Sequence, residues 1–223
     1  MKGKKNMTQT TEIIFTNLFA MLRNEFFGER NSILPMSEYK CRKLEALRKR
    51  IDDEQLYSAA ETYSFESNHQ ERWRKKVYDG ERHAIDTSIE TMQLLNIVVF
   101  NISRIEQGTL SIRGLITLGL YLRQQGHRVD FVKFETWVKQ LRIYGMVSLI
   151  SSLLIQLFSF APDEFPFRFK TYPQAFLWAY LQLTDQHKNT PLHRTKSIIL
   201  FSPIGTLALW KKVTQNALDS IEE

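Results

Sequence analysis

Acidic side chains that could hold a metal ion occur at two places in the chain. Asp52, Asp53 and Glu54 follow one another, and Asp163 precedes Glu164. Closely spaced carboxylates bind Mg²⁺ in enzymes that transfer phosphoryl groups. The first set stands where a helix is expected to start, the place at which acids meet the positive end of the helix dipole, and the second lies in a proline-bounded loop. Structural roles are expected for both sets, so the sequence predicts no metal site and no catalytic residue.

Basic side chains surround an aromatic one in the run RWRKK. Arg72, Arg74, Lys75 and Lys76 flank Trp73, and this mixture suits phosphate contacts combined with base stacking. The four cations are therefore candidate anion-binding residues. The competing interpretation is a solvated strand whose charges prevent edge-to-edge association.

A fifth candidate for anion binding is Arg113, which stands on an otherwise apolar helix. A guanidinium in such a place must be paired or reach solvent, and it could hold an anion. The competing interpretation is that its aliphatic stem lies on the core while its head reaches water or a neighbouring Glu.

Other catalytic and cofactor motifs are missing from the sequence. It contains no Gly-x-Ser-x-Gly elbow, no Walker glycine loop and no Gly-x-Gly-x-x-Gly. None of the five histidines has another four residues away, the spacing that places two imidazoles on one helical face. Cys41 is the only cysteine, which excludes an internal disulfide and indicates a reducing compartment, the cytoplasm. No cofactor is predicted.

The elements that position these residues are expected to be helices. The chain has 223 residues, 43% of them hydrophobic and 24% charged, with only nine Gly and six Pro. So few turn-forming residues disfavour an all-β fold, and the predicted class is mainly α, an irregular helical bundle. Periodic apolar positions and capping residues predict helices over residues 11–27, 37–51, 87–105, 111–124, 130–141, 143–161, 173–183 and 202–221.

One β-hairpin is the most that the fold class allows, at about residues 72–85. Asp79 and Gly80 stand there between WRKKVY and ERHAI, and Asp-Gly favours the type I′ turn of a two-residue hairpin loop. The predicted organisation is an N-terminal helical segment over residues 1–68, a hairpin and linker over 69–88, and a helical bundle domain over 89–223.

Neither the uncharged stretch at residues 143–161 nor the net charge of the chain identifies a membrane or another partner. Residues 143–161 lack charge, but Ser148, Ser151, Ser152 and Gln156 gather on one helical face. We therefore expect a core helix whose serines face solvent or a neighbouring segment, and no membrane partner. The net charge of +6 is spread along the chain and identifies no partner by itself.

The stretch from Thr91 to Phe167 resembles the helical C-terminal part of a family of uncharacterised bacterial nucleotidyltransferases, in which a polymerase-beta-like core carries a helical tail. The resemblance is carried in order by a glycine, a leucine-arginine-x-leucine helix, a glycine loop, an Asp-led helix with a tryptophan, and a proline-acidic-aromatic loop. The matching residues are Gly108, Ile112-Arg113-Gly114-Leu115, Gly126, Asp130-Phe131, Trp137, Gly145 and Pro162-Asp163-Glu164-Phe165-Pro166-Phe167. Thr117 departs from the family, which usually has an acid one turn after the leucine-arginine motif.

The catalytic motif of that family is not found in this chain. The family core needs a Gly-Ser turn followed by two acids that bind Mg²⁺ and nucleotide, whereas no acid-x-acid pair follows a Gly-Ser in this chain. The resemblance implies a non-catalytic helical module that acts by binding a protein or another ligand. One alternative is a divergent Mg²⁺-dependent nucleotidyltransferase using Asp52, Asp53, Asp79 and Asp86. Another is a basic nucleic-acid-binding protein.

Overall fold

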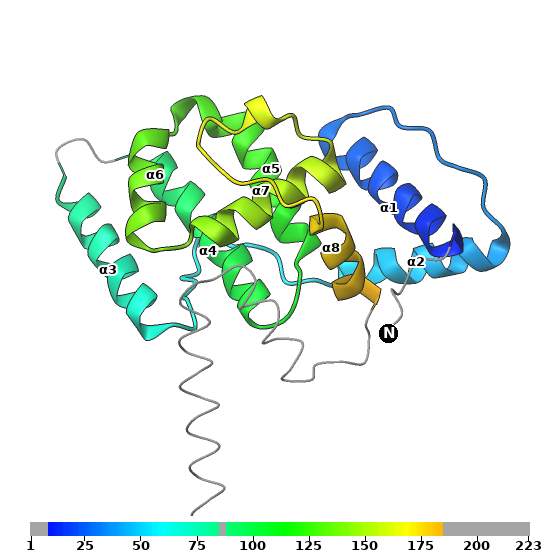
Figure 1. Ribbon diagram of the computed structural model, residues 1–223, viewed down its shortest axis with the longest axis horizontal. Helices are drawn as coiled ribbons and strands as arrows, with labels where there is room; N and C mark the ends of the chain where they lie inside the picture. The colour runs from blue at the N-terminus through cyan, green and yellow to red at the C-terminus, as the bar shows by residue number, and fades with distance from the viewer. Residues whose placement is uncertain (1–8, 85–87, 185–223) are drawn as a thin grey trace, which may run out of the picture.

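The protein is a mainly α, irregular helical bundle, as the composition predicts. The computed structural model describes residues 9–84 and 88–184, and within them it contains eight α-helices, two short 3-10 helices and no β-strand (Figure 1). The elements are α1 Gln9–Phe27, α2 Glu38–Asp52, α3 Asn68–Arg82, α4 Ile89–Glu106, α5 Ile112–Gln125, η1 Gly126–Arg128, α6 Phe131–Gln140, α7 Tyr144–Phe158, η2 Pro162–Glu164 and α8 Ala175–Thr184. The helix predicted over 202–221 lies outside the described residues.

The hairpin predicted at residues 72–85 is wrong, because this stretch forms α3. Asp79 and Gly80 lie inside the helix and make no turn. The residues that α3 buries, Gln70, Arg74 and Glu81 together with Val77, recur at a helical spacing, but all except Val77 are polar or charged. An amphipathic helix is predicted from a stripe of apolar residues along one face. Because the buried face of α3 is mostly polar and charged, its sequence lacks that stripe and the helix was not predicted. The linker boundary at residue 88 stays a prediction.

α7 lies at the centre of the bundle and contacts α1, α4, α5, α6 and α8 (Figure 1). Its three interior serines, Ser148, Ser151 and Ser152, are as deeply buried as its leucines. The polar face predicted for this helix therefore points toward a neighbouring segment. Among the described helices, none combines the length and apolar character needed to cross a bilayer.

That neighbouring segment is the coil of residues 165–174, here called the strap. The backbone N–H of Lys170 donates to Ser148 Oγ at 3.1 Å, and that of Tyr172 donates to Ser152 Oγ at 2.9 Å. Gln156 donates to the carbonyl of Tyr172 at 2.8 Å and accepts from the N–H of Phe176 at 2.7 Å. The polar groups of the buried helix and of the strap thus satisfy one another.

The spacing of these bonds follows from the geometry of helix and coil. Two residues of extended chain advance by about 6.6 Å, and four residues of α-helix advance by about 6.0 Å. Alternate strap residues therefore meet side chains four apart on α7. The strap also carries three phenylalanines. Phe165, Phe167 and Phe169 pack against one another with ring centroids 5.1–6.2 Å apart.

α4 and α5 cross closely at Gly114. A Cβ at this position would lie 2.6 Å from Asn101 Oδ1 and 2.7 Å from a ring carbon of Phe100. Asn101 is buried and donates to the carbonyls of Ile97 at 2.9 Å and Gly114 at 3.1 Å. The glycine thus lets the two backbones approach until one amide side chain bridges them.

The residues that carry the resemblance hold turns, caps and packing positions. Gly108 takes a φ of 76° after α4, and Asp130 accepts from the N–H of Lys133 at 2.9 Å to cap α6. Trp137 is buried on the inner face of α6. Each role is structural in this chain.

Replacing Gly114 with alanine should lower the free energy of unfolding by about 1–3 kcal/mol, the usual effect of overpacking. The matched control is Gly80→Ala, because nothing lies within 4 Å of a Cβ there. Alanine favours a helix more than glycine, so the control should gain up to about 1 kcal/mol. Urea denaturation measures both, and a Gly114→Ala variant as stable as the parent would contradict the close crossing.

Replacing Ser152 with alanine should destabilise the protein by about 1–3 kcal/mol, because the N–H of Tyr172 would lose its acceptor. Hydrogen exchange should also show faster exchange at the Tyr172 amide than in the parent. Ser64→Ala on the surface is the control and should change neither quantity. Unchanged exchange at Tyr172 would show that Ser152 does not anchor the strap.

Candidate binding surface

α3 lies at one end of the long axis of the molecule (Figure 1). It docks on the bundle through polar contacts. Gln70 donates from its amide to the carbonyl of Leu141 at 3.2 Å. Glu81 is ion-paired with Lys133 of α6 at 3.0 Å and accepts from the N–H of Ser88 at 2.7 Å. These bonds attach both ends of α3 to the α4–α6 side of the bundle and fix its rotation.

The middle of the inner face is occupied by Arg74, which is only 5% exposed. Its guanidinium donates to both carboxylate oxygens of Glu71, at 2.9 and 2.6 Å, and lies 5.0 Å from the ring of Tyr78. The Tyr78 hydroxyl donates to Asn96 of α4, and burial raises the pKa of Tyr78 to about 12. Hydrogen bonding to Glu71 raises the pKa of Arg74, so this cation is held in the structure.

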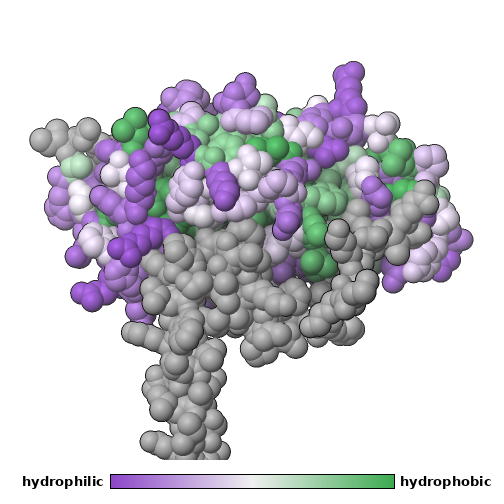
Figure 2. Space-filling model, in the orientation of Figure 1, coloured by the Kyte–Doolittle hydropathy of each residue, from purple (hydrophilic) through white to green (hydrophobic). Residues whose placement is uncertain are grey.

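Of the four cations predicted to bind anions in RWRKK, Arg74 is thus turned inward and the other three are exposed. Arg72, Lys75 and Lys76 stand on the outer face of α3, followed two turns later by Arg82. Asp79 is the exposed carboxylate among them, since Glu71 and Glu81 are engaged on the inner side. Hydrophilic side chains gather over this end of the molecule in Figure 2.

Trp73 lies at the edge of this outer face and is 38% exposed. Its indole N–H donates to Nε2 of His69 at 3.3 Å, and the ammonium of Lys76 lies 4.6 Å from its ring centroid. The ring is therefore held in place by two neighbours on its own helix. We call Arg72, Trp73, Lys75, Lys76 and Arg82 the outer face of α3.

Arg113, the other predicted anion-binding residue, already holds a carboxylate. Its guanidinium donates to Oδ1 of Asp52 at 2.6 Å and lies over the ring of Phe26, 5.2 Å from its centroid. Asp52 also accepts from Arg48 at 3.1 Å. The guanidinium therefore ties α5 to the end of α2, which is the structural interpretation of this residue.

The prediction that the acids at 52–54 start a helix is wrong, because Asp52 ends α2 and Asp53 follows it. Glu54 instead serves the start of another helix. Its carboxylate accepts from the hydroxyl of Ser111 at 3.0 Å and from the N–H of Arg113 at 2.9 Å, at the first turn of α5. Burial raises the pKa of Glu54, and these bonds offset part of the rise.

The second acidic set also has structural contacts. Glu164 pairs with Arg123 at 2.8 Å and accepts from the N–H of Ala161 at 2.8 Å. The hydrogen bond from Arg123 lowers the pKa of Glu164. The same guanidinium stacks over Phe160 at 4.0 Å from the ring centroid, so it connects α5 to the chain that leads into η2.

The acids named for a nucleotidyltransferase are not brought together. Asp52 and Asp53 lie at the end of α2, whereas Asp79 lies on α3 at the far end of the molecule (Figure 1). Asp86 lies outside the described residues. In the part of the chain that the structure describes, no group of three or more His, Cys, Asp or Glu side chains is arranged to hold a metal ion.

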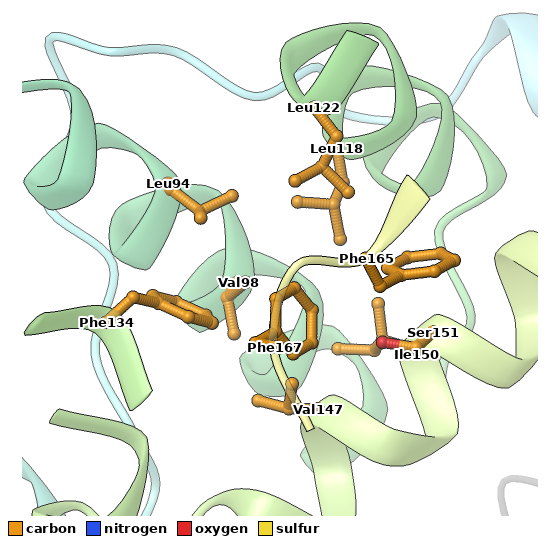
Figure 3. A pocket seen from close by; sticks show the side chains of 10 residues that line it. All are labelled: Leu94, Val98, Leu118, Leu122, Phe134, Val147, Ile150, Ser151, Phe165 and Phe167. Carbon is orange, nitrogen blue, oxygen red and sulfur yellow. The ribbon is translucent and has the colours of Figure 1, made fainter. Parts of the chain in front are cut away.

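A small apolar hollow lies between α4, α5, α6 and α7, beneath the strap. Figure 3 shows Phe134 and Phe167 at the hollow with Phe165 also in its lining, and Ser151 supplies the one polar side chain of the lining. Sites for small molecules combine an apolar lining with several placed polar groups. This hollow is part of the core on which the strap packs.

One buried acid was missed at the sequence level. Glu106 is 5% exposed at the end of α4, where it accepts from the N–H of Glu66 at 2.9 Å. Burial raises the pKa of Glu106 to about 7. No local signal marks it, since a glutamate at a helix end ordinarily lies in solvent.

No family model matches this sequence, and neither a curated protein nor a solved structure matches it. The resemblance to the helical tail of bacterial nucleotidyltransferases therefore stays a prediction. The outer face of α3 must be interpreted from its own chemistry.

Replacing Glu106 with glutamine should remove a pH dependence of stability. The folded pKa of about 7 exceeds the ordinary value of 4.5, so the folded state retains a proton that the unfolded state loses between these pH values. Stability is then fully present below pH 4.5 and declines up to about pH 7, by about 3 kcal/mol for one group. Glutamine can still accept from the N–H of Glu66.

Chemical denaturation at pH 5 and pH 8 measures this effect. The Glu106→Gln variant should gain stability relative to the parent as the pH rises, whereas Glu45→Gln, at an exposed position of α2, should follow the parent. Parallel pH profiles for Glu106→Gln and the parent would contradict the raised pKa.

Proposed function

We propose that this chain is a non-catalytic helical module that acts by binding, and that the outer face of α3 is the surface that contacts an anionic partner. The observation that carries the proposal is that the acids of α3 are mostly on its inner side and its cations mostly on its outer side. The acids Glu71 and Glu81 are used in inner ion pairs, while Arg72, Lys75, Lys76 and Arg82 are exposed. A helix sorted in this way presents a local positive field that the net charge alone does not predict.

Two further features support a binding role for this surface. α3 is attached at both ends through Gln70 and Glu81, and these contacts turn Arg72, Lys75 and Lys76 toward the outside. Exposed aromatic and arginine side chains are also typical of the anchors of interfaces. Trp73 and Arg72 supply both types side by side.

The other cations considered for anion binding are occupied. Arg113 holds Asp52, and Arg74 holds Glu71. Asp52, one of the acids that a nucleotidyltransferase would use, is bonded to two guanidinium groups. These contacts favour a structural role for that region and a binding role for α3.

Immobilised heparin, a general polyanion, tests the location of the surface. The full chain should be retained, and the triple variant R72Q/K75Q/K76Q should elute at clearly lower salt, because exposed cations supply most of such binding. The matched control, R42Q/K43Q/K49Q, removes the same charge from exposed positions on α2 and should elute close to the parent.

Equal shifts for the two triple variants would contradict the proposal, since net charge would then explain retention. Absence of retention for the parent would contradict it as well. Circular dichroism and melting temperature establish that both variants are folded.

A further inference from the structure

We propose that the outer face of α3 binds single-stranded nucleic acid, with Trp73 stacking on a base and the neighbouring cations contacting phosphates. This inference rests on the proposed function and names the class of partner. A polyanion without aromatic rings would use only the cations of this surface. Trp73 lies among these cations, and the bases of a nucleic acid supply rings that can stack on it.

The exposed cations of α3 are spread over the side of the helix that faces away from its buried stripe. Gln70, Arg74, Val77 and Glu81 form the buried stripe. At 100° per residue, Arg72 and Lys76 fall opposite this stripe, whereas Lys75 and Arg82 lie together toward one flank of the helix. Ten residues of helix advance by about 15 Å, a length that extends over several consecutive phosphates.

Trp73 is prepared for stacking. An aromatic ring loses little conformational freedom on binding when its neighbours already hold it, and here His69 accepts its N–H while Lys76 covers the ring. Stacking of a base on an aromatic side chain is stronger than an exposed cation–π contact. A base can therefore replace the Lys76 ammonium on the ring, which frees that ammonium for a phosphate.

A single strand fits this arrangement better than a duplex. Bases in a duplex are already stacked, so their faces are closed to a side chain on a helix surface, whereas single strands present a ring face at every nucleotide. Backbone contacts by Arg72, Lys75 and Lys76 require no particular sequence. We therefore expect binding with little sequence preference.

Removing the negative charge of Asp79 tests the surface through a gain of affinity, a result that a misfolded protein would not produce. Its exposed carboxylate lies on the same side as Arg72 and Lys76, where it opposes phosphate. Asp79→Asn should tighten binding by a few-fold at low salt. A damaged protein would lose affinity instead.

The experiment is fluorescence anisotropy of a labelled dT oligonucleotide titrated with the full chain at several salt concentrations. Three phosphate contacts predict a slope of log affinity against log salt of about −2. R72Q/K75Q/K76Q should abolish most of that slope, and R42Q/K43Q/K49Q should retain it. Trp73→Ala should weaken binding by about tenfold without changing the slope, and Trp73→Phe should keep most of the affinity.

Several outcomes would overturn the inference. Equal affinity for a duplex of the same length, or an unaltered affinity in Trp73→Ala, would exclude stacking as the basis of recognition. Retention on heparin through α3 without binding to dT or U oligonucleotides would leave the proposed function standing and indicate an acidic protein surface. Loss of α3-dependent binding in both assays would overturn the inference and the proposed function together.

Discussion

The burial of residues 146–154 of α7 is the constraint on which the rest of the structure depends. A helix in contact with five others leaves little water for the hydroxyl groups of its buried serines, so these groups need partners inside the protein. The backbone of the strap supplies hydrogen-bond partners to Ser148, Ser152 and Gln156 of α7. Its phenylalanines then close the hollow between α4, α5, α6 and α7, which makes the strap part of the core.

α3 is held by the opposite strategy. It buries one aliphatic side chain, Val77, among Gln70, Arg74 and Glu81, and its attachment depends on directional bonds. Directional bonds fix the rotation of a helix about its axis more narrowly than an apolar stripe does. This rotation turns Arg74 inward and keeps Arg72, Lys75 and Lys76 outside, so the docking contacts determine the composition of the exposed surface.

The sequence predicted most of the helices and their faces but failed at α3, whose buried face is mainly polar and charged. The apolar periodicity of α4, α5 and α6 and the serine face of α7 were sufficient, because each pattern has a local physical meaning. α3 has no such pattern, and the Asp79-Gly80 pair is a hairpin signal only when strands flank it. Its inner residues become recognisable as a helical stripe once polar side chains are counted as buried.

The basic cluster of the candidate site was predicted from the sequence, but the orientation and the partners of its side chains were not. RWRKK was identified by composition, yet which cation points inward depends on Glu71, Tyr78 and the docking of the helix. The Asp52 partner of Arg113 lies 61 residues away in sequence, and Glu54 reaches the start of α5 from a similar separation. Partners that distant are set by tertiary packing and leave no local pattern.

The most direct test of α3 as the binding surface is a map of the residues that a single strand contacts. Amide and indole NMR signals of the full chain can be followed during titration with an unlabelled dT oligonucleotide. Shifts concentrated at the Trp73 indole and at the amides of residues 72–76, with the buried Trp137 indole unchanged, are the predicted result. Shifts centred on α2, or spread evenly over all exposed lysines and arginines, would contradict a defined surface on α3.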